Sequence, residues 1–330
     1  MKWFLALDQG SKHLESYAEM ARVAVLTAKR YTTLDIHLLF DGDEDHPLVL
    51  WMKAQGVHVW ILRTPFYDAL KQLATDKNDP DILSFGAGTF LRLEIPRLAA
   101  QHGWDDDYVL YADCDILFLR DPVPALSQLR PRFFAVAPEG DPTDWININA
   151  GVMLLNMENM TRIDEELHAF TAKNLAGFTD YRNSQAFDQS VFRHFFRRIT
   201  KRVINGGGKV GFNKTRAYAK VYGRFWYRLV DPFDTPLWDR LPIEFNWKSY
   251  WPGGEDKAFI VHFHGPKPNE GRMETSPESL ASRNNPQLIE VLSLWRNDAY
   301  AAMCQRWQRE LEQGEPTRGQ PAPESAVPSP

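Results

Sequence analysis

Hydrophobic residues in the first half of the chain form short runs that alternate with amphipathic segments. Four runs of strand length are mostly apolar, namely residues 3–7, 35–40, 57–62 and 108–112. Between the first two, apolar residues recur at helical spacing on one face, formed by Tyr17, Ala21, Ala24, Val25 and Ala28. Strands that are apolar on both faces and separated by helices predict an α/β fold, with a mostly parallel sheet covered by helices on both sides. Ligands of such sheets bind beyond the carboxyl ends of the strands.

The pattern of the second half is less regular. A short apolar run at 258–265 predicts one further strand. From Pro286 to about Gln313, an apolar stripe at helical spacing predicts a helix that packs on the main domain. The last residues are rich in Pro, Ser and Ala, which predicts disorder. We therefore expect three parts, an α/β domain at 1–268, a C-terminal helical appendage at 269–313 and a disordered tail at 314–330.

Composition narrows the classes of protein. The 330 residues are 44% hydrophobic and 13% aromatic, which is enough to bury one large core. Only two cysteines occur, Cys114 and Cys304, and this excludes a disulfide framework and a metal site made of thiolates. The net charge of -5 indicates no nucleic-acid partner. Because the apolar runs have only strand length and Asp8 ends the first one, we expect no membrane span and no export signal, and hence a cytoplasmic protein.

Two aspartates interrupt the end of the fourth apolar run, in the stretch YVLYADCDILFLRDP at residues 108–122. On a strand, Asp113 and Asp115 would point to the same side while Cys114 points to the other. Two carboxylates so close together are costly unless a cation lies between them, and hard oxygen ligands favour Mg²⁺ or Mn²⁺. The alternative is that the strand has already ended and both side chains are solvated or cap a helix.

A D-x-D pair after a strand also occurs in phosphatases of the haloacid-dehalogenase type, where the first aspartate is the nucleophile. Those enzymes carry Thr or Ser two positions after the second aspartate, and its hydroxyl holds the phosphoryl group. This chain has Leu117 at that position, and a leucine side chain offers no hydroxyl. The phosphatase interpretation is therefore an alternative that lacks one of its expected groups.

Further segments accompany the aspartates in a fixed order. They are FLRLEIPRL (90–98), YVLYADCDILFLRDP (108–122), NINAGVMLLNMENM (147–160), SQAFDQSVFR (184–193) and VHFHGPKP (261–268). Together they resemble glycosyltransferase family 8, the glycogenin-like and bacterial lipooligosaccharide galactosyltransferase-like enzymes. The resemblance spans roughly residues 1–268 and implies a GT-A-like, Rossmann-like domain. It also implies transfer of a hexose from a nucleotide sugar, usually a UDP-sugar, with Mn²⁺ and with retention of anomeric configuration.

The resemblance implies roles for the residues that surround the leaving group. Asp113, Asp115 and His262 would bind the metal, with Asp113 also contacting the ribose of the nucleotide. Lys267 would neutralise the diphosphate as it leaves, and Gly265 would let the backbone approach closely. Without the resemblance, a lone histidine on an apolar strand such as His262 is more often a hydrogen-bonded core residue.

Two further residues are implied to lie beside the anomeric carbon. They are Asp188 and Gln189, of which Gln189 would stabilise positive charge or position the acceptor. Because an amide is a poor nucleophile, we expect a same-face displacement rather than a double displacement through a carboxylate. The alternative for this pair is an ordinary helix start, since Asp is a favoured cap. The remaining donor contacts implied by the resemblance come from Asp8, Arg92, Asn149, Ala150 and Gly151.

The chain departs from the family pattern at two places. Gln9 and Gly10 follow Asp8, where family members often have Asn-Tyr, and one residue fewer precedes Lys267 in the last motif. The metal and catalytic residues are intact, which favours an active enzyme. A nucleotide-sugar-binding protein of the same fold that has lost turnover is the second alternative.

A basic segment lies outside all of these motifs. Residues 193–230 contain eleven Lys and Arg residues and no Asp or Glu, interleaved with aromatic residues that include Phe195 and Phe196. Such a local positive field predicts an anionic acceptor, for example a phosphorylated glycolipid of the lipopolysaccharide-core kind, presented at the cytoplasmic membrane surface. The alternative is a solvated basic face whose aromatic residues belong to the core.

Overall fold

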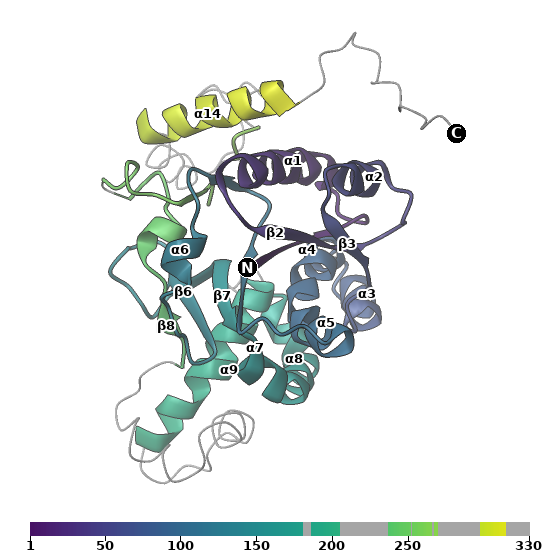
Figure 1. Ribbon diagram of the computed structural model, residues 1–330. Helices are drawn as coiled ribbons and strands as arrows, with labels where there is room; N and C mark the ends of the chain where they lie inside the picture. Colours follow the sequence, from purple (N-terminus) through teal and green to yellow (C-terminus); the bar gives the residue numbers. More distant parts are fainter. Residues whose placement is uncertain (181–185, 205–236, 252, 266, 270–297, 315–330) are drawn as a thin grey trace, which may run out of the picture.

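The computed structural model describes residues 1–180, 186–204, 237–251, 253–265, 267–269 and 298–314 (Figure 1). The strands of its main sheet are β1 (Lys2–Asp8), β2 (Asp35–Asp41), β3 (His58–Ile61), β4 (Tyr108–Ala112), β6 (Phe134–Pro138), β7 (Ile148–Asn156) and β8 (Asp239–Arg240). They lie in the order β3-β2-β1-β4-β7-β6-β8. Strand β7 is antiparallel to β4 and β6, and every other neighbouring pair is parallel. The predicted α/β class with a mostly parallel sheet is confirmed.

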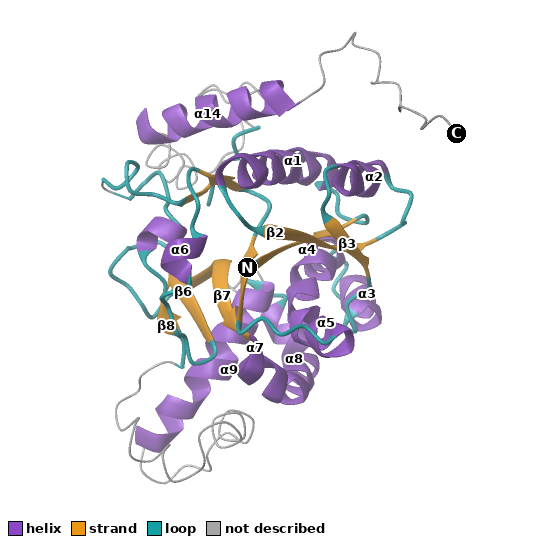
Figure 2. Cartoon of the chain, viewed as in Figure 1, coloured by secondary structure: helices purple, strands orange, loops and turns teal. Residues whose placement is uncertain are grey.

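Helices cover both faces of the sheet, as Figure 2 shows. One face carries α1 (Leu14–Tyr31), α2 (Pro47–Ala54) and α6 (Val123–Leu126). The other carries α3 (Tyr67–Asp76), α4 (Asp81–Thr89), η1 (Phe90–Glu94), α5 (Ile95–His102), α7 (Met157–Arg162), α8 (Asp164–Phe178) and α9 (Phe187–Ile204). A second, two-stranded antiparallel sheet consists of β5 (Ile116–Phe118) and β9 (Ile260–His262), and the short 3₁₀ helix η3 (Ile243–Phe245) contacts β9.

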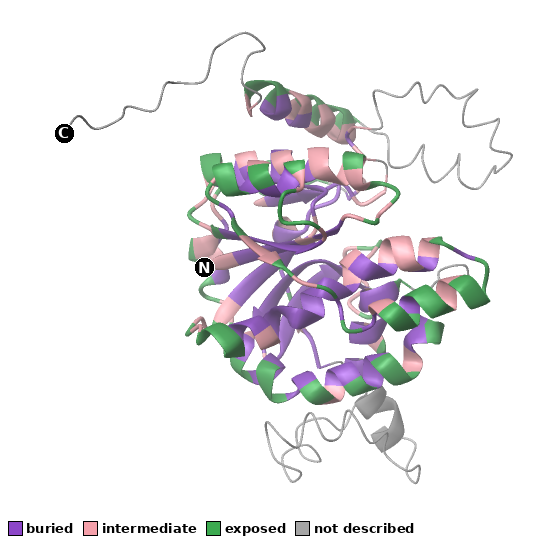
Figure 3. Cartoon of the chain, turned by 90° about the vertical axis from the view of Figure 1, so that its right-hand side faces the viewer, coloured by how far each residue is buried: buried purple, intermediate pink, exposed green. Residues whose placement is uncertain are grey.

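Alternation along the central strands divides the core into two layers. In β1, Trp3 and Leu5 belong to the layer under α1, whereas Phe4 belongs to the layer under α4 and α5, and all three are fully buried. Both faces of the strand are therefore covered, which explains why the run is apolar at successive positions. Figure 3 shows the strands as the buried centre between two layers of helices.

The aspartates of the D-x-D motif do not lie on a strand. Strand β4 ends at Ala112, and Asp113, Cys114 and Asp115 form the connection to β5. The expectation that strand alternation orients the two carboxylates is wrong. They are placed instead by backbone hydrogen bonds, from Asp113 N–H to the Gly151 carbonyl (2.8 Å) and from Phe263 N–H to the Asp115 carbonyl (2.9 Å).

The C-terminal helix α14 (Asp298–Gly314) packs against α1 (Figure 1). Trp307 and Leu311 of α14 are buried, and Glu310 accepts hydrogen bonds from Arg30 and Tyr31 of α1. The predicted helix from Pro286 begins among residues outside the described ones, as does the predicted tail after Gly314. The division into 1–268, 269–313 and 314–330 stays a prediction. Among the described residues, no helix is both long and apolar enough to cross a bilayer.

A buried charge cluster fixes α8 to the preceding elements. His168 Nδ1 lies 3.1 Å from Asp164, and its Nε2 lies 2.8 Å from Glu94 of η1. Arg97 completes the cluster through a 2.8 Å ion pair with Asp164. Burial alone lowers the pKa of His168, but the hydrogen bonds and charges of Asp164 and Glu94 outweigh it and raise the pKa to about 9.

This cluster predicts a specific pH dependence of stability. Because the folded-state pKa of His168 lies above the unfolded value, its contribution is complete below about pH 6.5 and is lost as the pH rises through about 9. We expect the difference in unfolding free energy between wild type and His168→Gln to be up to about 3 kcal/mol at pH 6 and to shrink by pH 9.5. Urea unfolding of both proteins across this range measures it. A difference that is constant or grows with pH would contradict the charged state of His168.

Candidate metal and ligand site

The predicted site residues meet in a single cavity of about 330 Å³. It opens where β1 and β4 end, and α1, α4, η1, β7, α9 and β9 contribute further walls. Eleven of the twelve predicted residues line it, namely Asp8, Arg92, Asp113, Asp115, Asn149, Ala150, Gly151, Asp188, Gln189, His262 and Lys267. The exception is Gly265, whose φ of 110° lies in the region that favours glycine. The roles of these residues stay predictions.

Three side chains converge as a metal site requires. The ligand atoms of Asp113, Asp115 and His262 all lie within 4.8 Å of one another. Asp115 Oδ1 is buried 3.4 Å from His262 Nε2, and within the described residues no donor hydrogen-bonds to it. Burial and the flanking carboxylates raise the pKa of Cys114 well above its ordinary value, so its thiol is neutral. Two carboxylates and one imidazole form a donor set that suits Mn²⁺ or Mg²⁺.

Lys267 supplies the positive charge next to these carboxylates. Its Nζ donates to Asp115 Oδ2 (2.5 Å) and to the Phe263 carbonyl (3.0 Å). Burial alone would raise the pKa of Asp115, but the opposite charge of Lys267 is the strongest opposing effect, and the pKa lies far below its ordinary range. Asp115 is therefore ionised in the folded protein, in the form that binds a cation.

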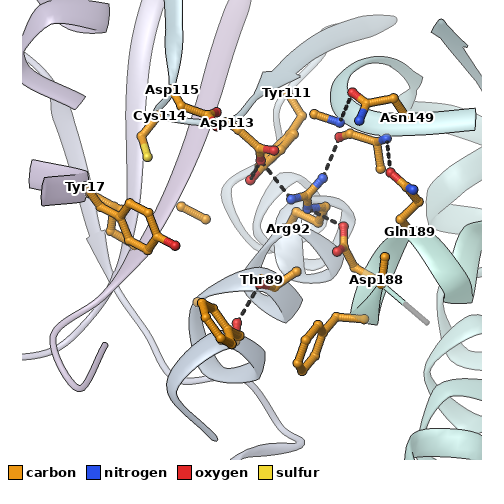
Figure 4. Close-up of a pocket in the computed structure, with 18 of the residues that line it drawn as sticks. Tyr17, Thr89, Arg92, Tyr111, Asp113, Cys114, Asp115, Asn149, Asp188 and Gln189 are labelled. Carbon is orange, nitrogen blue, oxygen red and sulfur yellow. Dashed lines mark hydrogen bonds and ion pairs between the residues drawn. The ribbon is translucent and has the colours of Figure 1, made fainter. Parts of the chain in front are cut away.

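Arg92 of η1 contacts residues from several elements of the cavity wall (Figure 4). Its guanidinium donates to the Ala150 carbonyl (2.6 Å) and to Asp113 Oδ1 (2.9 Å), and its Nε lies 2.7 Å from Asp188 Oδ2. It also stacks 3.9 Å from the centre of the Tyr111 ring, whose hydroxyl donates to Asp113 Oδ1 (2.9 Å). One buried cation thus holds both acidic residues in place, and it bonds Asp113 through Oδ1.

Asp188 and Gln189 begin α9 and face the cavity from opposite ends of the Arg92 network (Figure 4). Burial raises the pKa of Asp188 to about 7, even though Arg92 opposes this effect. The Gln189 amide is held at both ends: Oε1 accepts from Ala150 N–H (2.8 Å) and Nε2 donates to Glu139 (3.1 Å). The side chain of Gln189 therefore has a fixed orientation in the cavity wall.

Sequence reasoning missed Glu139, a half-buried carboxylate at the centre of this wall. It directly follows β6, so the general placement of ligand sites after strands was the signal that could have found it. Its oxygens accept from Asn149 Nδ2 (2.8 Å) and Gln189, and they pair with His264 Nε2 (2.8 Å). Burial raises the pKa of Glu139, but His264 and Asn149 outweigh it and lower the pKa to about 2.

Gly151 allows close packing against the predicted metal ligand. A Cβ atom at this position would lie 2.3 Å from His262 Cε1 and 2.9 Å from Asn149 Oδ1. The contact that the structure shows for this glycine is therefore with His262. Any larger residue would displace the imidazole from the cavity wall.

The end of the cavity near β1 has a different character. Burial, opposed by a hydrogen bond from the Gly10 backbone, raises the pKa of Asp8 to about 6. The aromatic rings of Tyr17 and Phe85 also line the cavity, and Figure 4 shows Tyr17 across the cavity from Arg92. A flat apolar surface beside a carboxyl group can stack on and hydrogen-bond to a heterocyclic base.

A second cluster of metal-binding side chains lies at the opposite end of the sheet. Asp35, His37 and His58 also have ligand atoms within 4.8 Å of one another. However, Trp60 Nε1–H donates to His37 Nδ1 (3.0 Å), so the proton of a neutral His37 must be on Nε2, where Asp35 Oδ2 accepts it at 2.9 Å. Nε2 then has no lone pair for a cation. We interpret this cluster as a hydrogen-bonded chain.

The basic segment is described only in part. Phe195 and Phe196 are fully buried in the core beneath α8, so they are not available to contact lipid or sugar. Their assignment to an exposed binding surface is wrong, because α9 uses this face to pack on β6 and α8. Arg193 of the same helix donates to Asn147 Oδ1 (3.3 Å). Residues 205–236 lie outside the described residues.

No protein-family profile and no curated protein matches this sequence. The fold is similar to solved structures of glycosyltransferases. One is the apo form of glycosyltransferase GlyE from Streptococcus pneumoniae TIGR4, with 16% identity and a TM-score of 0.49 over 97% of this chain and 65% of that one. A second is galactosyltransferase LgtC in complex with donor and acceptor sugar analogs, with 14% identity and a TM-score of 0.45 over 95% and 96% of the two chains. Mouse xyloside xylosyltransferase 1 covers 79% of this chain at 12% identity and a TM-score of 0.40, over 96% of its own chain. At these identities, function has to be argued from the site itself.

Proposed function

We propose that this protein is a metal-dependent, retaining glycosyltransferase of the family 8 type, which moves a hexose from a nucleotide sugar, most simply a UDP-hexose, to a glycan or glycolipid. The observation that carries the proposal is the unpartnered Asp115 Oδ1, which faces His262 Nε2 beside Asp113. Lys267 donates to the other oxygen of Asp115, so Oδ1 and His262 Nε2 face each other across a space that fits a cation. The adjoining cavity of about 330 Å³ has room for a ligand, and Tyr17 and Phe85 line its far end.

The reaction needs charge stabilisation at the leaving group. Cleavage of the bond between the anomeric carbon and the phosphate oxygen places negative charge on the diphosphate. A divalent cation held by Asp113, Asp115 and His262 would neutralise part of that charge. Lys267 would provide a second positive charge, since its ammonium group already lies beside Asp115. The aromatic end near Asp8 would bind the nucleoside.

The charged and polar groups of the wall favour a same-face displacement over a carboxylate nucleophile. Asp188 is paired with Arg92 at 2.7 Å, and Glu139 already accepts hydrogen bonds from Asn149 and Gln189. Oxygens engaged in this way are poorer nucleophiles, because attack would remove their partners. The Gln189 amide dipole is fixed and would stabilise positive charge on the sugar. The acceptor hydroxyl would then approach from the side of the departing phosphate.

The haloacid-dehalogenase alternative is disfavoured by the same geometry. Asp113 Oδ1 accepts from both Arg92 and Tyr111, so only Oδ2 would remain for the role of nucleophile. Leu117 is fully buried in β5 and offers no group for a phosphoryl oxygen. This leaves the inactive sugar-nucleotide-binding protein as the alternative that an experiment must separate.

A donor screen tests the proposal. In the presence of Mn²⁺, one nucleotide sugar among UDP-glucose, UDP-galactose and GDP-mannose is expected to raise the melting temperature and to be hydrolysed slowly. Gln189→Ala should lower turnover roughly 10²-fold and change donor affinity far less, because its amide acts mainly on the developing charge. Transfer to neutral and to phosphorylated glycans, and binding to neutral and to anionic vesicles, test the class of acceptor.

The outcomes separate the alternatives. Donor binding without hydrolysis or transfer would identify an inactive binding protein. A product of inverted configuration in an NMR spectrum would contradict the retaining mechanism. Equal transfer to neutral and phosphorylated acceptors would contradict the anionic acceptor that the basic segment 193–230 predicts.

A further inference from the structure

His262 is held by a chain of buried amides that starts at a backbone N–H. Gly151 N–H donates to Asn149 Oδ1 (3.1 Å), Asn246 Nδ2 donates to the same oxygen (2.9 Å), and Asn246 Oδ1 lies 2.8 Å from His262 Nδ1. Asn246 has no exposed surface, and Asn149 and His262 are each 4% exposed. Water therefore does not compete for these bonds.

The backbone donor fixes the direction of every bond in the chain. Since Gly151 N–H can only donate, the Asn149 atom that faces it is the oxygen, and Glu139 accepts from the Asn149 Nδ2 at the other end (2.8 Å). Asn246 must then present its NH₂ group to Asn149 and its oxygen to His262. His262 Nδ1 consequently carries a proton, and in a neutral His262 it is Nε2, facing Asp115, that carries the lone pair.

We propose that Asn246 is a positioning residue, which keeps His262 in the Nδ1–H tautomer so that Nε2 is ready to bind a divalent cation. This inference rests on the proposed function, because it concerns the same metal site. The family resemblance implied a donor contact for Asn149. We propose instead that its oxygen, which accepts from Gly151 N–H and from Asn246, orients Asn246. Partners that orient a ligating histidine in this way commonly change metal affinity 10- to 100-fold when removed.

The competing tautomer explains why the chain matters. Without an acceptor at Nδ1, the His262 proton would move to Nε2, where Asp115 Oδ1 lies 3.4 Å away and accepts it. That state satisfies both side chains without a cation. A metal ion would then have to displace the proton to Nδ1, where no partner remains, and its affinity would fall.

Two substitutions at Asn246 separate positioning from packing. Asn246→Leu keeps the volume but removes the acceptor, and we expect Mn²⁺ affinity, measured by calorimetry, to fall roughly 10- to 100-fold. Asn246→Asp keeps an acceptor for His262 Nδ1–H while facing the Asn149 oxygen, so it should lose stability yet bind Mn²⁺ more tightly than the leucine variant. Asn159→Leu is the matched control. Asn159 of α7 is also a buried asparagine, and it donates to the Arg132 carbonyl (2.6 Å).

The tautomer of His262 can be measured in the absence of metal. In proton–nitrogen NMR spectra of histidine-labelled protein, with His262 assigned through His262→Gln, wild type should show a protonated Nδ1 and Asn246→Leu a protonated Nε2. A protonated Nε2 in wild type, or loss of Mn²⁺ affinity that follows stability equally in both Asn246 variants and Asn159→Leu, would overturn the inference. If wild type shows the expected tautomer but binds no Mn²⁺, the proposed function fails instead.

Discussion

Replacing Asp115 with Asn is expected to abolish Mn²⁺-dependent binding of a nucleoside diphosphate. The substitution removes the buried anionic oxygen that has no other partner, and it leaves Lys267 without its counter-charge at the same point. Loss of a ligand should exceed the 10- to 100-fold effect of an outer partner, so we expect at least about 100-fold weaker Mn²⁺ binding. Calorimetric titration of UDP with and without Mn²⁺ measures the change.

The control for Asp115 is an exposed aspartate. Asp105 precedes β4 and lies away from the cavity walls, so Asp105→Asn should leave UDP and Mn²⁺ binding unchanged. Asp115→Asn must also keep its cooperative unfolding transition for the comparison to hold. An Asp115→Asn protein that is folded and binds UDP with undiminished metal dependence would place the cation elsewhere.

Replacing Arg92 with Met is expected to destabilise the fold by about 3–5 kcal/mol. The guanidinium is 6% exposed and is the counter-charge of both Asp113 and Asp188, so its removal leaves uncompensated buried charge. The pKa of Asp188 is already about 7 and should rise further in the variant. Because the folded-state pKa then lies above the unfolded one, the deficit should be largest near pH 8 and should shrink as the pH falls toward 5.

Arg97 provides the matched control for Arg92. Its side chain is 36% exposed and pairs with Asp164 and Glu94, so Arg97→Met should cost at most about 1 kcal/mol. Urea unfolding of both variants at pH 5 and pH 8 makes the comparison. Equal losses for the two arginines, or a deficit of the Arg92 variant that grows at low pH, would show that Arg92 does not neutralise the two aspartates.

The sequence predicted which residues form the candidate site better than it predicted how they are arranged. Eleven of the predicted residues line one cavity, although they lie as far apart in the sequence as Asp8 and Lys267. The reason given for Asp113 and Asp115 was wrong, since β4 ends before them. Hydrogen bonds to Gly151 and Phe263, supplied by β7 and the residue after β9, set their positions, and strand periodicity carries no information about such partners.

Phe195 and Phe196 are a second case in which the sequence alone could not decide between two structures. A run of basic and aromatic residues is compatible with a binding surface or with one buried face of an amphipathic helix. The choice depends on what packs against α9, and here Phe133, Phe134 and Phe170 do so. Those three residues belong to segments that lie before α9 in the chain and are not adjacent to it in sequence.

The sequence by itself determined the α/β class, the central strands and most of the residues that were predicted to lie together in the cavity. Apolar periodicity reports the burial of a segment directly, because each side chain faces the core or the solvent according to its position in the repeat. Only the tertiary structure revealed the contacts of Glu139 and Asn246 with the candidate site. Asn246 meets Asn149 across 97 residues of sequence and Asn149 meets Glu139 from a neighbouring strand. A hydrogen bond of this kind needs a specific donor, acceptor and distance, and the path of the whole chain fixes all three.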